Sequence, residues 1–262
     1  MEKELKVGLF QADIIWEDIE ANQDKISGLL SGLDDKPDLL VLPEMYTTGF
    51  TSNYDNLNIS TVNRQLEWQL ALSKESGVSI LGSVLFFDNK RYRNRIFLTQ
   101  PDSQYDYYDK RHLFQAEKEN NNLEPGNRRV TINLKETKIM PQICYDLRFP
   151  VWSRNNTGYH ILVYVANWPE IRSKIWTTLL KARAIENQCY VIGVNRVGAD
   201  KNNIRYNGKS AVYGPQGEEI LVMDHIEAYG KANLSVKELV NYREKFGAYK
   251  DSDIFEIKNQ EY

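Results

Sequence analysis

The order of short apolar and amphipathic segments restricts the fold of this chain more than any other feature. Residues 5–12 and 38–43 are apolar runs that predict buried strands, and residues 18–33 between them carry apolar side chains at helical spacing. The same order recurs later, where the apolar run 159–167 precedes the long helical pattern 171–189. This alternation predicts an α/β protein whose mixed sheets carry helices on their outer faces.

The middle of the chain contains hairpins. Residues 60–76 have a helical pattern. Three strand patterns joined by short polar turns follow, at residues 78–87, 92–101 and 104–110. Residues 115–128 are polar and irregular, which predicts a surface loop, and strand patterns resume at 129–134 and 137–143. Periodicity alone does not decide whether these strands form one sheet or two.

The long helical pattern carries one apolar stripe, which predicts the face that packs on the core. Its members recur three or four positions apart and are Ile175, Leu179, Ala182 and Ile185. Arg183 and Glu186 lie three positions apart on the same helix, and we expect them to form a structural ion pair. Strands joined by glycine-bearing turns follow, and a last helix is expected over 235–245.

Charge and hydropathy exclude several classes of protein. The net charge of -3 and the pI near 5.8 give no basic field for nucleic acid. The local basic cluster Lys90, Arg91, Arg93 and Arg95 is interpreted as the solvated face of a hairpin. No window approaches the ~20 apolar residues of a membrane span, and the N-terminal segment lacks an apolar stretch of signal-peptide length. We therefore expect a cytoplasmic protein without nucleic-acid or membrane partners.

No linker, repeat or low-complexity segment interrupts the chain, so residues 1–262 are interpreted as a single domain. With 42% hydrophobic residues, the chain can bury a large core. Its two cysteines, Cys144 and Cys189, fit reduced thiols better than one disulfide. Cys189 opens a buried strand and is expected to be inert.

Three ionisable residues, Glu44, Lys110 and Cys144, stand where strand patterns end. A cysteine attacks only as its thiolate, so with an ordinary pKa near 8.5 it needs a base or a positive neighbour. Glu44, whose pKa we expect burial to raise, can accept the thiol proton, and Lys110 can supply the positive charge. Taken singly, the cysteine fits a small core residue and the other two fit surface charges. Taken together, they predict one active site.

Three segments resemble, in the same order, the signature segments of the nitrilase or carbon-nitrogen hydrolase superfamily. They are LPEMYTTGF at 42–50, YDKRHLF at 108–114 and ICYDLRFP at 143–150. The resemblance extends from GLFQAD near the start through ANWP and ARAIENQCYVIGVNRVG to AVYGPQGE, and it is closest to the ω-amidase branch. It implies an αββα sandwich of two mixed sheets packed face to face. It also implies a homodimer, in which the C-terminal tail from about residue 247 packs on the partner subunit.

The resemblance also implies catalytic roles. Glu44 is the general base, Lys110 the cationic stabiliser and Cys144 the nucleophile. A second glutamate of the family precedes a Pro-Gly pair, and here Glu119 matches the spacing best, with Leu123 four positions on and Gly126 seven on. The competitors for this position are Glu117 and Glu124.

The implied reaction is covalent acyl transfer. The thiolate attacks an amide carbon, and the oxyanion is held by Lys110 and the backbone N–H of Tyr145. Arg148, four residues after the nucleophile, can bind a substrate carboxylate, or alternatively can orient the turn through a salt bridge. Phe50, Tyr145 and Trp168 are expected as apolar walls, with core packing as the alternative for each.

The sequence therefore predicts an amidohydrolase that converts a small dicarboxylic acid monoamide, of the 2-oxoglutaramate or succinamate type, to acid and ammonia. The alternatives are another activity of the superfamily, such as a nitrilase or N-carbamoyl amino acid hydrolase, a binding module without turnover, and a redox pair of the two cysteines. No cofactor or metal is expected, because the chemistry needs none and the three histidines, at 112, 160 and 225, lack ligand spacing.

Overall fold

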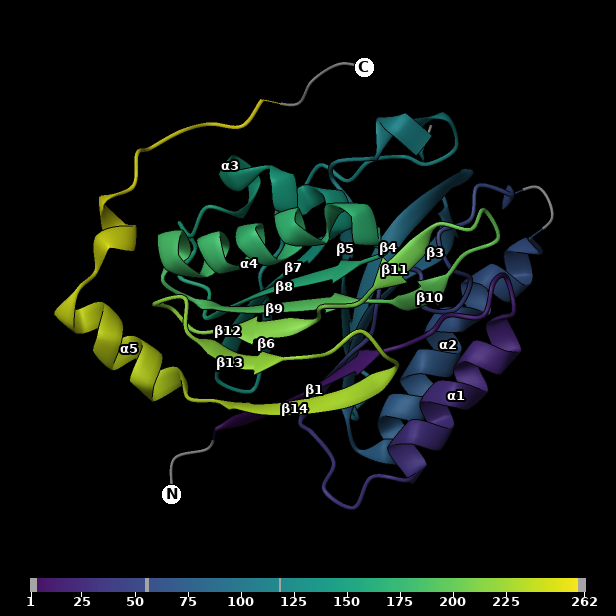
Figure 1. Cartoon of the computed structure of the whole chain (residues 1–262), viewed down its shortest axis with the longest axis horizontal. Helices are drawn as coiled ribbons and strands as arrows, with labels where there is room; N and C mark the ends of the chain where they lie inside the picture. Colours follow the sequence, from purple (N-terminus) through teal and green to yellow (C-terminus); the bar gives the residue numbers. More distant parts are fainter. Residues whose placement is uncertain (1–3, 55–56, 118, 259–262) are drawn as a thin grey trace.

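In the computed structural model, which describes residues 4–54, 57–117 and 119–258, two six-stranded sheets dominate the molecule (Figure 1). In the first sheet, the strands follow the order β14-β1-β2-β3-β4-β5. Their bounds are β1 Leu5–Gln11, β2 Leu39–Val41, β3 Ser79–Asp88, β4 Arg91–Thr99, β5 Tyr105–Asp109 and β14 Ala228–Leu234. Strands β1, β2 and β3 are parallel, and the other neighbouring pairs are antiparallel.

In the second sheet, the order is β13-β12-β9-β8-β7-β6. Its strands are β6 Ile132–Leu134, β7 Thr137–Ile143, β8 Ile161–Ala166, β9 Tyr190–Asn195, β12 Ala211–Tyr213 and β13 Glu219–Val222. The three central strands β7, β8 and β9 are parallel, and the flanking pairs are antiparallel. A small separate hairpin pairs β10 (Val197–Ala199) with β11 (Arg205–Asn207).

Strands β1 to β3 and β7 to β9 are buried on both faces over most of their length, which explains why they are almost continuously apolar. In β2, Leu39 and Val41 face the core between the sheets, whereas Leu40 faces the helices. In β8, Val163 lies in the core between the sheets and Leu162 faces the opposite layer. The two sheets thus pack face to face with helices outside, as the resemblance implied, and the expected αββα architecture is confirmed.

Helices α1 and α2 cover the first sheet, and α4 covers the second (Figure 1). The helices are α1 Ile19–Ser31, α2 Ile59–Ser76, α3 Pro150–Ser153, α4 Ser173–Asn187 and α5 Val236–Lys245. Local chemistry fixes their ends: Asp18 and Asn58 accept backbone N–H groups of the first turns of α1 and α2, and Gly77 ends α2 with a φ of 72°. No helix among the described residues is long and apolar enough to cross a membrane.

Two of the four residues in the apolar stripe predicted for α4 are exposed, although Leu179 packs partly against the core. Ile175 and Ile185 are 38% and 49% exposed, whereas Trp176 and Leu180 are fully buried. The helix is turned so that its largest apolar side chain is removed from water, which releases the most hydrophobic free energy. Gly193 of β9 makes room for this packing, since a Cβ there would lie 2.3 Å from a methyl carbon of Leu180.

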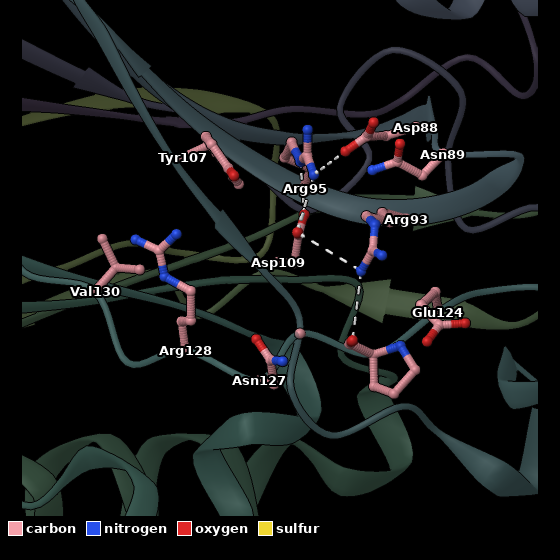
Figure 2. A pocket seen from close by; sticks show the side chains of 12 residues that line it. Asp88, Asn89, Arg93, Arg95, Tyr107, Asp109, Glu124, Asn127, Arg128 and Val130 are labelled. Atoms are coloured by element: carbon pink, nitrogen blue, oxygen red, sulfur yellow. Dashed lines mark hydrogen bonds and ion pairs between the residues drawn. The ribbon is translucent and has the colours of Figure 1, made fainter.

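The basic cluster at the β3–β4 hairpin is not one solvated face, contrary to the sequence interpretation. Lys90 and Arg91 are exposed, but Arg95 is only 5% exposed. Figure 2 shows the Arg95 guanidinium between the carboxylates of Asp88 and Asp109, in a cavity beside the loop that follows β5. Side chains alternate along β4, and these two carboxylates compensate the charge of the buried arginine.

Candidate active site

The three ionisable residues predicted from the strand ends lie together. Glu44 follows β2, Lys110 follows β5 and Cys144 follows β7. The Lys110 ammonium donates a hydrogen bond to Glu44 Oε1 at 2.8 Å, and both side chains are buried. Cys144 is half-buried, its thiol donates to the Asn167 carbonyl at 3.9 Å, and the negative charge of Glu44 acts on its pKa. The arrangement joins a proton acceptor, a cation and a sulfur nucleophile.

Two residues at this site adopt the left-handed backbone conformation that favours glycine. Cys144 has a φ of 44° and Met45, next to Glu44, has a φ of 45°. Each such conformation costs about 1–3 kcal/mol in a non-glycine residue and is kept only where surrounding contacts enforce it. Cys144 also begins the 3₁₀ turn η4 (Cys144–Arg148), so the chain turns sharply at the sulfur.

Glu119 is the glutamate that the structure brings to this cluster. It lies in the 3₁₀ turn η3 (Glu119–Asn121), is 2% exposed, and accepts hydrogen bonds from Lys110 Nζ at 3.0 and 2.9 Å. The backbone N–H of Phe114 donates to it at 2.6 Å. Glu124 is exposed and lines another cavity, and the side chain of Glu117 lies outside the described part of the chain.

The segment 115–128 therefore departs from the predicted surface loop. It contains two 3₁₀ turns, η2 (Gln115–Glu117) and η3, and buries both Glu119 and Leu123. The polar composition of the segment did not indicate this burial. A carboxylate can be buried in the protein interior when it is paired with a buried ammonium.

The charges in the cluster act on each other. Burial alone would lower the pKa of Lys110, but the negative charges of Glu119 and Glu44 outweigh it and raise this pKa well above its ordinary value. Burial raises the pKa of Glu119, and the charge of Glu44 adds to this, although Lys110 opposes both. Lys110 consequently stays protonated and acts as a fixed positive charge.

The cation does not create a resting thiolate at Cys144. Burial raises the pKa of the thiol well above its ordinary value, the charge of Glu44 raises it further, and the opposing effect of Lys110 is smaller. The sequence had suggested Lys110 as one way to populate the thiolate. The structure instead favours a thiol that loses its proton to a base only as the sulfur attacks.

Two asparagines of the site were missed in the analysis of the sequence. Asn94 of β4 donates to Glu44 Oε1 at 2.8 Å, and Asn167, directly after β8, donates its backbone N–H to Glu44 Oε2 at 2.8 Å. The Asn167 side chain also donates to the Glu44 carbonyl at 2.7 Å. The available signal was an asparagine within or at the end of an apolar strand, where a buried amide needs polar partners.

Asp146, also missed, links the lysine segment to the cysteine turn. Its buried carboxylate accepts the Tyr108 hydroxyl at 2.7 Å, the His112 backbone N–H at 2.9 Å and the Ile143 N–H at 3.0 Å. These donors stand two residues before Lys110, two residues after it, and one residue before the nucleophile. An aspartate two positions after the cysteine was the sequence signal.

A cavity of about 240 Å³ opens onto the cluster, and it contains every predicted wall residue. The Phe50 ring lies 5.4 Å from Lys110 Nζ, Tyr145 packs on Phe114, and the Arg148 guanidinium lies 5.3 Å from the Trp168 ring centre. The turn η4, which carries Tyr145 and Arg148, is held by a different arginine. Arg183 donates to the Leu147 carbonyl at 2.7 Å and forms its predicted ion pair with Glu186 at 3.0 Å.

Two arginines of the cavity have no carboxylate partner among the described residues. One is Arg148, so the structure does not support its alternative role in a salt bridge. The other is Arg172, which was not predicted from the sequence and whose guanidinium lies 5.4 Å from the Phe114 ring centre. Arg172 ends the 3₁₀ turn η5 (Glu170–Arg172), and its carbonyl accepts the Trp168 indole N–H at 2.9 Å. Both guanidiniums are available to an anionic ligand.

The two cysteines are separate, free thiols. Cys189 is fully buried at the end of α4, and burial raises its pKa to about 12. Such a thiol is almost entirely protonated at neutral pH, which agrees with the inert role expected from the sequence.

Comparisons with known proteins agree with this geometry. Residues 6–239 match the family model for carbon-nitrogen hydrolases. The chain is 42% identical over 254 residues to Omega-amidase YafV of Escherichia coli strain K12, covering 97% of this chain and 98% of that protein. It is 32% identical over 250 residues to the 2-oxoglutaramate amidase of Bacillus subtilis strain 168, covering 94% and 96% of the two chains.

Among solved structures, XC1258 from Xanthomonas campestris matches with a TM-score of 0.92 and 35% identity, over 98% of this chain and 100% of that one. That protein is described as a CN-hydrolase superfamily member with an arsenic adduct in its active site. The family expected from the three sequence segments is thus confirmed, and the chain belongs to the carbon-nitrogen hydrolase family.

Proposed function

We propose that this enzyme hydrolyses the terminal amide of a small dicarboxylic acid monoamide, of the 2-oxoglutaramate or succinamate type, to the acid and ammonia. The observation that carries the proposal is the cluster of Glu44, Lys110 and Cys144, which faces a cavity with two guanidiniums that have no carboxylate partner in the described part of the chain. The likeness to proteins named Omega-amidase and 2-oxoglutaramate amidase supports the same substrate class.

In the proposed reaction, Glu44 takes the thiol proton as Cys144 Sγ attacks the amide carbon. The Lys110 ammonium and the Tyr145 backbone N–H hold the oxyanion. Glu44 then gives the proton to the nitrogen, the C–N bond breaks, and ammonia leaves a thioester on the cysteine. A water transfers a proton to Glu44 and attacks the thioester, and collapse releases the acid while the proton returns to sulfur.

Glu119 has a supporting role in this scheme. Its two oxygens contact the Lys110 ammonium at 3.0 and 2.9 Å. The pair keeps the lysine protonated and fixed in direction, and when the two Glu119 oxygens share one of the three ammonium protons and Glu44 takes the second, the third can point to the oxyanion. We therefore assign Glu119 as the second catalytic carboxylate.

The cavity walls suggest how an acidic amide is selected. Arg148 and Arg172 offer guanidiniums for the carboxylate at the far end of the substrate, and a charge-assisted pair of this kind fixes orientation as well as affinity. Phe50, Tyr145 and Trp168 enclose the aliphatic part. A neutral amide would gain only the second set of contacts.

The same catalytic groups could serve a nitrile or an N-carbamoyl amino acid, so a substrate panel decides between the activities. We expect ammonia release from 2-oxoglutaramate and succinamate, and much weaker turnover of a nitrile and an N-carbamoyl amino acid. Replacing Arg148 by Met should raise the KM for the acidic amides by about 10- to 100-fold, the loss of one charge-assisted hydrogen bond of about 1.5–3 kcal/mol. Equal losses on a neutral amide such as butyramide would contradict carboxylate recognition, and inactivity on both acidic amides would contradict the proposed function.

We further propose that residues 1–262 form one domain, that the protein is cytoplasmic, and that it forms a homodimer in which the tail from about residue 247 packs on the partner. The two free thiols support a reducing compartment. The exposed isoleucines Ile175 and Ile185 of α4 support an interface with a second copy, because exposed apolar side chains on one helix favour association.

Sedimentation tests the dimer. Replacing both Ile175 and Ile185 by Glu should shift the protein from dimer to monomer, because buried carboxylates without partners are costly at an interface. Replacing Lys174, an exposed residue of the same helix, by Glu is the matched control and should leave the dimer intact. A double variant that remains dimeric would place the interface elsewhere.

A further inference from the structure

The Arg95 guanidinium is bound to the residue that directly precedes Lys110. It donates to the two oxygens of Asp109 at 2.6 and 3.0 Å in a bidentate pair, and it also donates to Asp88 at 3.0 Å (Figure 2). Its charge lies 4.2 Å from the Tyr107 ring centre. Planar bidentate pairs restrict both distance and direction, so the end of β5 is fixed with respect to β4.

Arg93, two residues earlier on the same strand, reaches the other end of the segment that carries Glu119. Its Nη1 lies 3.8 Å from Asp109 Oδ2 and donates to the Pro125 carbonyl at 3.4 Å (Figure 2). The backbone of Tyr92 accepts the Glu124 N–H at 2.9 Å in the same region. Strand β4 thus holds the segment 109–126 at its start and near its end.

The two ends of this segment also contact each other. The Gly126 N–H donates to the Lys110 carbonyl at 2.8 Å. A Cβ at residue 126 would lie 2.2 Å from the Asp109 carbonyl oxygen, so the chain passes here only because the residue is glycine. A shift of Asp109 would consequently move both Lys110 and the base of the Glu119 loop.

Asn94 lies between the two arginines and its side chain points to the opposite side of β4. There it donates to Glu44 at 2.8 Å and to Glu119 at 3.5 Å. Within this stretch of β4, Asn94 contacts the carboxylates of Glu44 and Glu119. Arg93 and Arg95, on either side of it, contact the segment that carries Lys110.

We propose that Arg93 and Arg95 are positioning residues of the hydrolase. Through their contacts with Asp109 and Pro125, they fix the positions of Lys110 and Glu119. The inference rests on the proposed role of Lys110 as the oxyanion partner. Neither arginine lines the catalytic cavity, so they act through the segment and not on the substrate. The side chains around the cavity of Figure 2 accordingly hold the segment that carries Lys110 in place.

The test compares Arg95→Met with Arg91→Met, an exposed arginine of the same strand. We expect Arg95→Met to lower kcat by about 10²-fold with little change in KM, since a displacement of about 1 Å in a catalytic group can cost that much. Arg91→Met should match the wild type. Asp109→Asn should act like Arg95→Met, and the double variant should lose less than the product of the two effects, because both changes break one pair.

A second measurement does not depend on turnover. Since the charge of Lys110 opposes the rise in the pKa of Cys144, a displaced lysine should shift the pH profile for alkylation of Cys144 by iodoacetamide to higher pH in Arg95→Met and not in Arg91→Met. If the wild type hydrolyses none of the amides, the proposed substrate fails while this profile still tests the positioning role.

Circular dichroism and thermal melting monitor folding throughout. If Arg95→Met does not fold, Arg95→Lys keeps the charge but loses the bidentate pair, and Arg93→Met removes the contact with Pro125, so both should show the kcat loss in a smaller degree. A folded Arg95 variant that has a lower melting temperature but wild-type kcat and an unshifted alkylation profile would overturn the proposal, because the ion pair would then only stabilise the fold.

Discussion

Replacing Cys144 by Ala is expected to reduce ammonia release from 2-oxoglutaramate by more than about 10⁴-fold, because without the nucleophile no thioester forms. The loss should appear in kcat, since Arg148 and the aromatic walls remain to bind substrate. Mass spectrometry after rapid quenching gives a direct measurement. The wild-type peptide that contains Cys144 should carry the acyl group, and the variant should carry none.

Cys189→Ala is the matched control for this experiment. Cys189 is buried, and its thiol is almost entirely protonated, so its removal should leave kcat and the acyl adduct unchanged. The same control separates hydrolysis from redox chemistry, because a redox pair would need both cysteines and would respond to reductant. Normal turnover by Cys144→Ala would rule out the covalent mechanism.

Replacing Lys110 by Met should reduce both activity and stability. The ammonium separates two buried carboxylates, Glu44 at 2.8 Å and Glu119 at 2.9 Å, so its removal leaves like charges without compensation. Breaking a buried ion pair in this way costs about 3–5 kcal/mol of unfolding free energy. We expect a loss of kcat of at least about 10²-fold in addition, because the oxyanion loses its charged partner.

The stability of this variant should depend on pH with a defined sign. In the wild type, the raised pKa of Lys110 contributes stability at pH values below its ordinary pKa, and the contribution is lost as the pH rises through the folded value. In Lys110→Met, the stability should depend on the protonation of Glu119 instead. The pKa of Glu119 is raised, and its protonated form relieves the repulsion with Glu44 as the pH falls. Denaturant unfolding should therefore show a smaller deficit at pH 5.5 than at pH 8.

Lys138→Met provides the control for these measurements, because Lys138 is an exposed lysine on β7, near the nucleophile in sequence. It should show wild-type activity and little change in unfolding free energy at either pH. A Lys110→Met protein as stable as the wild type at pH 8 would contradict the charge balance described for the buried cluster.

The sequence was sufficient to predict the main chemistry. Lys110 follows the edge strand β5, so the positions at strand ends did not by themselves bring the three residues together, and the expectation that Glu44, Lys110 and Cys144 meet came from the resemblance of their three segments to one family. Glu119 was found through its spacing to Gly126, although the polar segment around it indicated a surface loop. The burial of Glu119 depends on Lys110, a partner nine residues away that composition does not reveal.

The remaining features depend on contacts across the fold. The orientation of α4 about its axis was predicted wrongly because periodicity weighs isoleucines equally with Trp176. How deeply Trp176 and Leu180 pack depends on Gly193 of β9, which lies outside the helix pattern itself. Arg95 was assigned to solvent because its partners Asp88 and Asp109 come from different strands. The raised pKa of Cys144 likewise results from the sum of burial and two opposing charges, which a linear sequence does not provide.

The contacts of Asp146 have a consequence for how the enzyme becomes active. Lys110 emerges from the first sheet and Cys144 from the second, and the Asp146 carboxylate joins them through Tyr108, His112 and Ile143. Sliding of one sheet across the other would break the hydrogen bonds to Tyr108 and His112. Catalytic competence therefore requires the two sheets to pack in register, and a chain with the sheets misaligned would be compact but inactive.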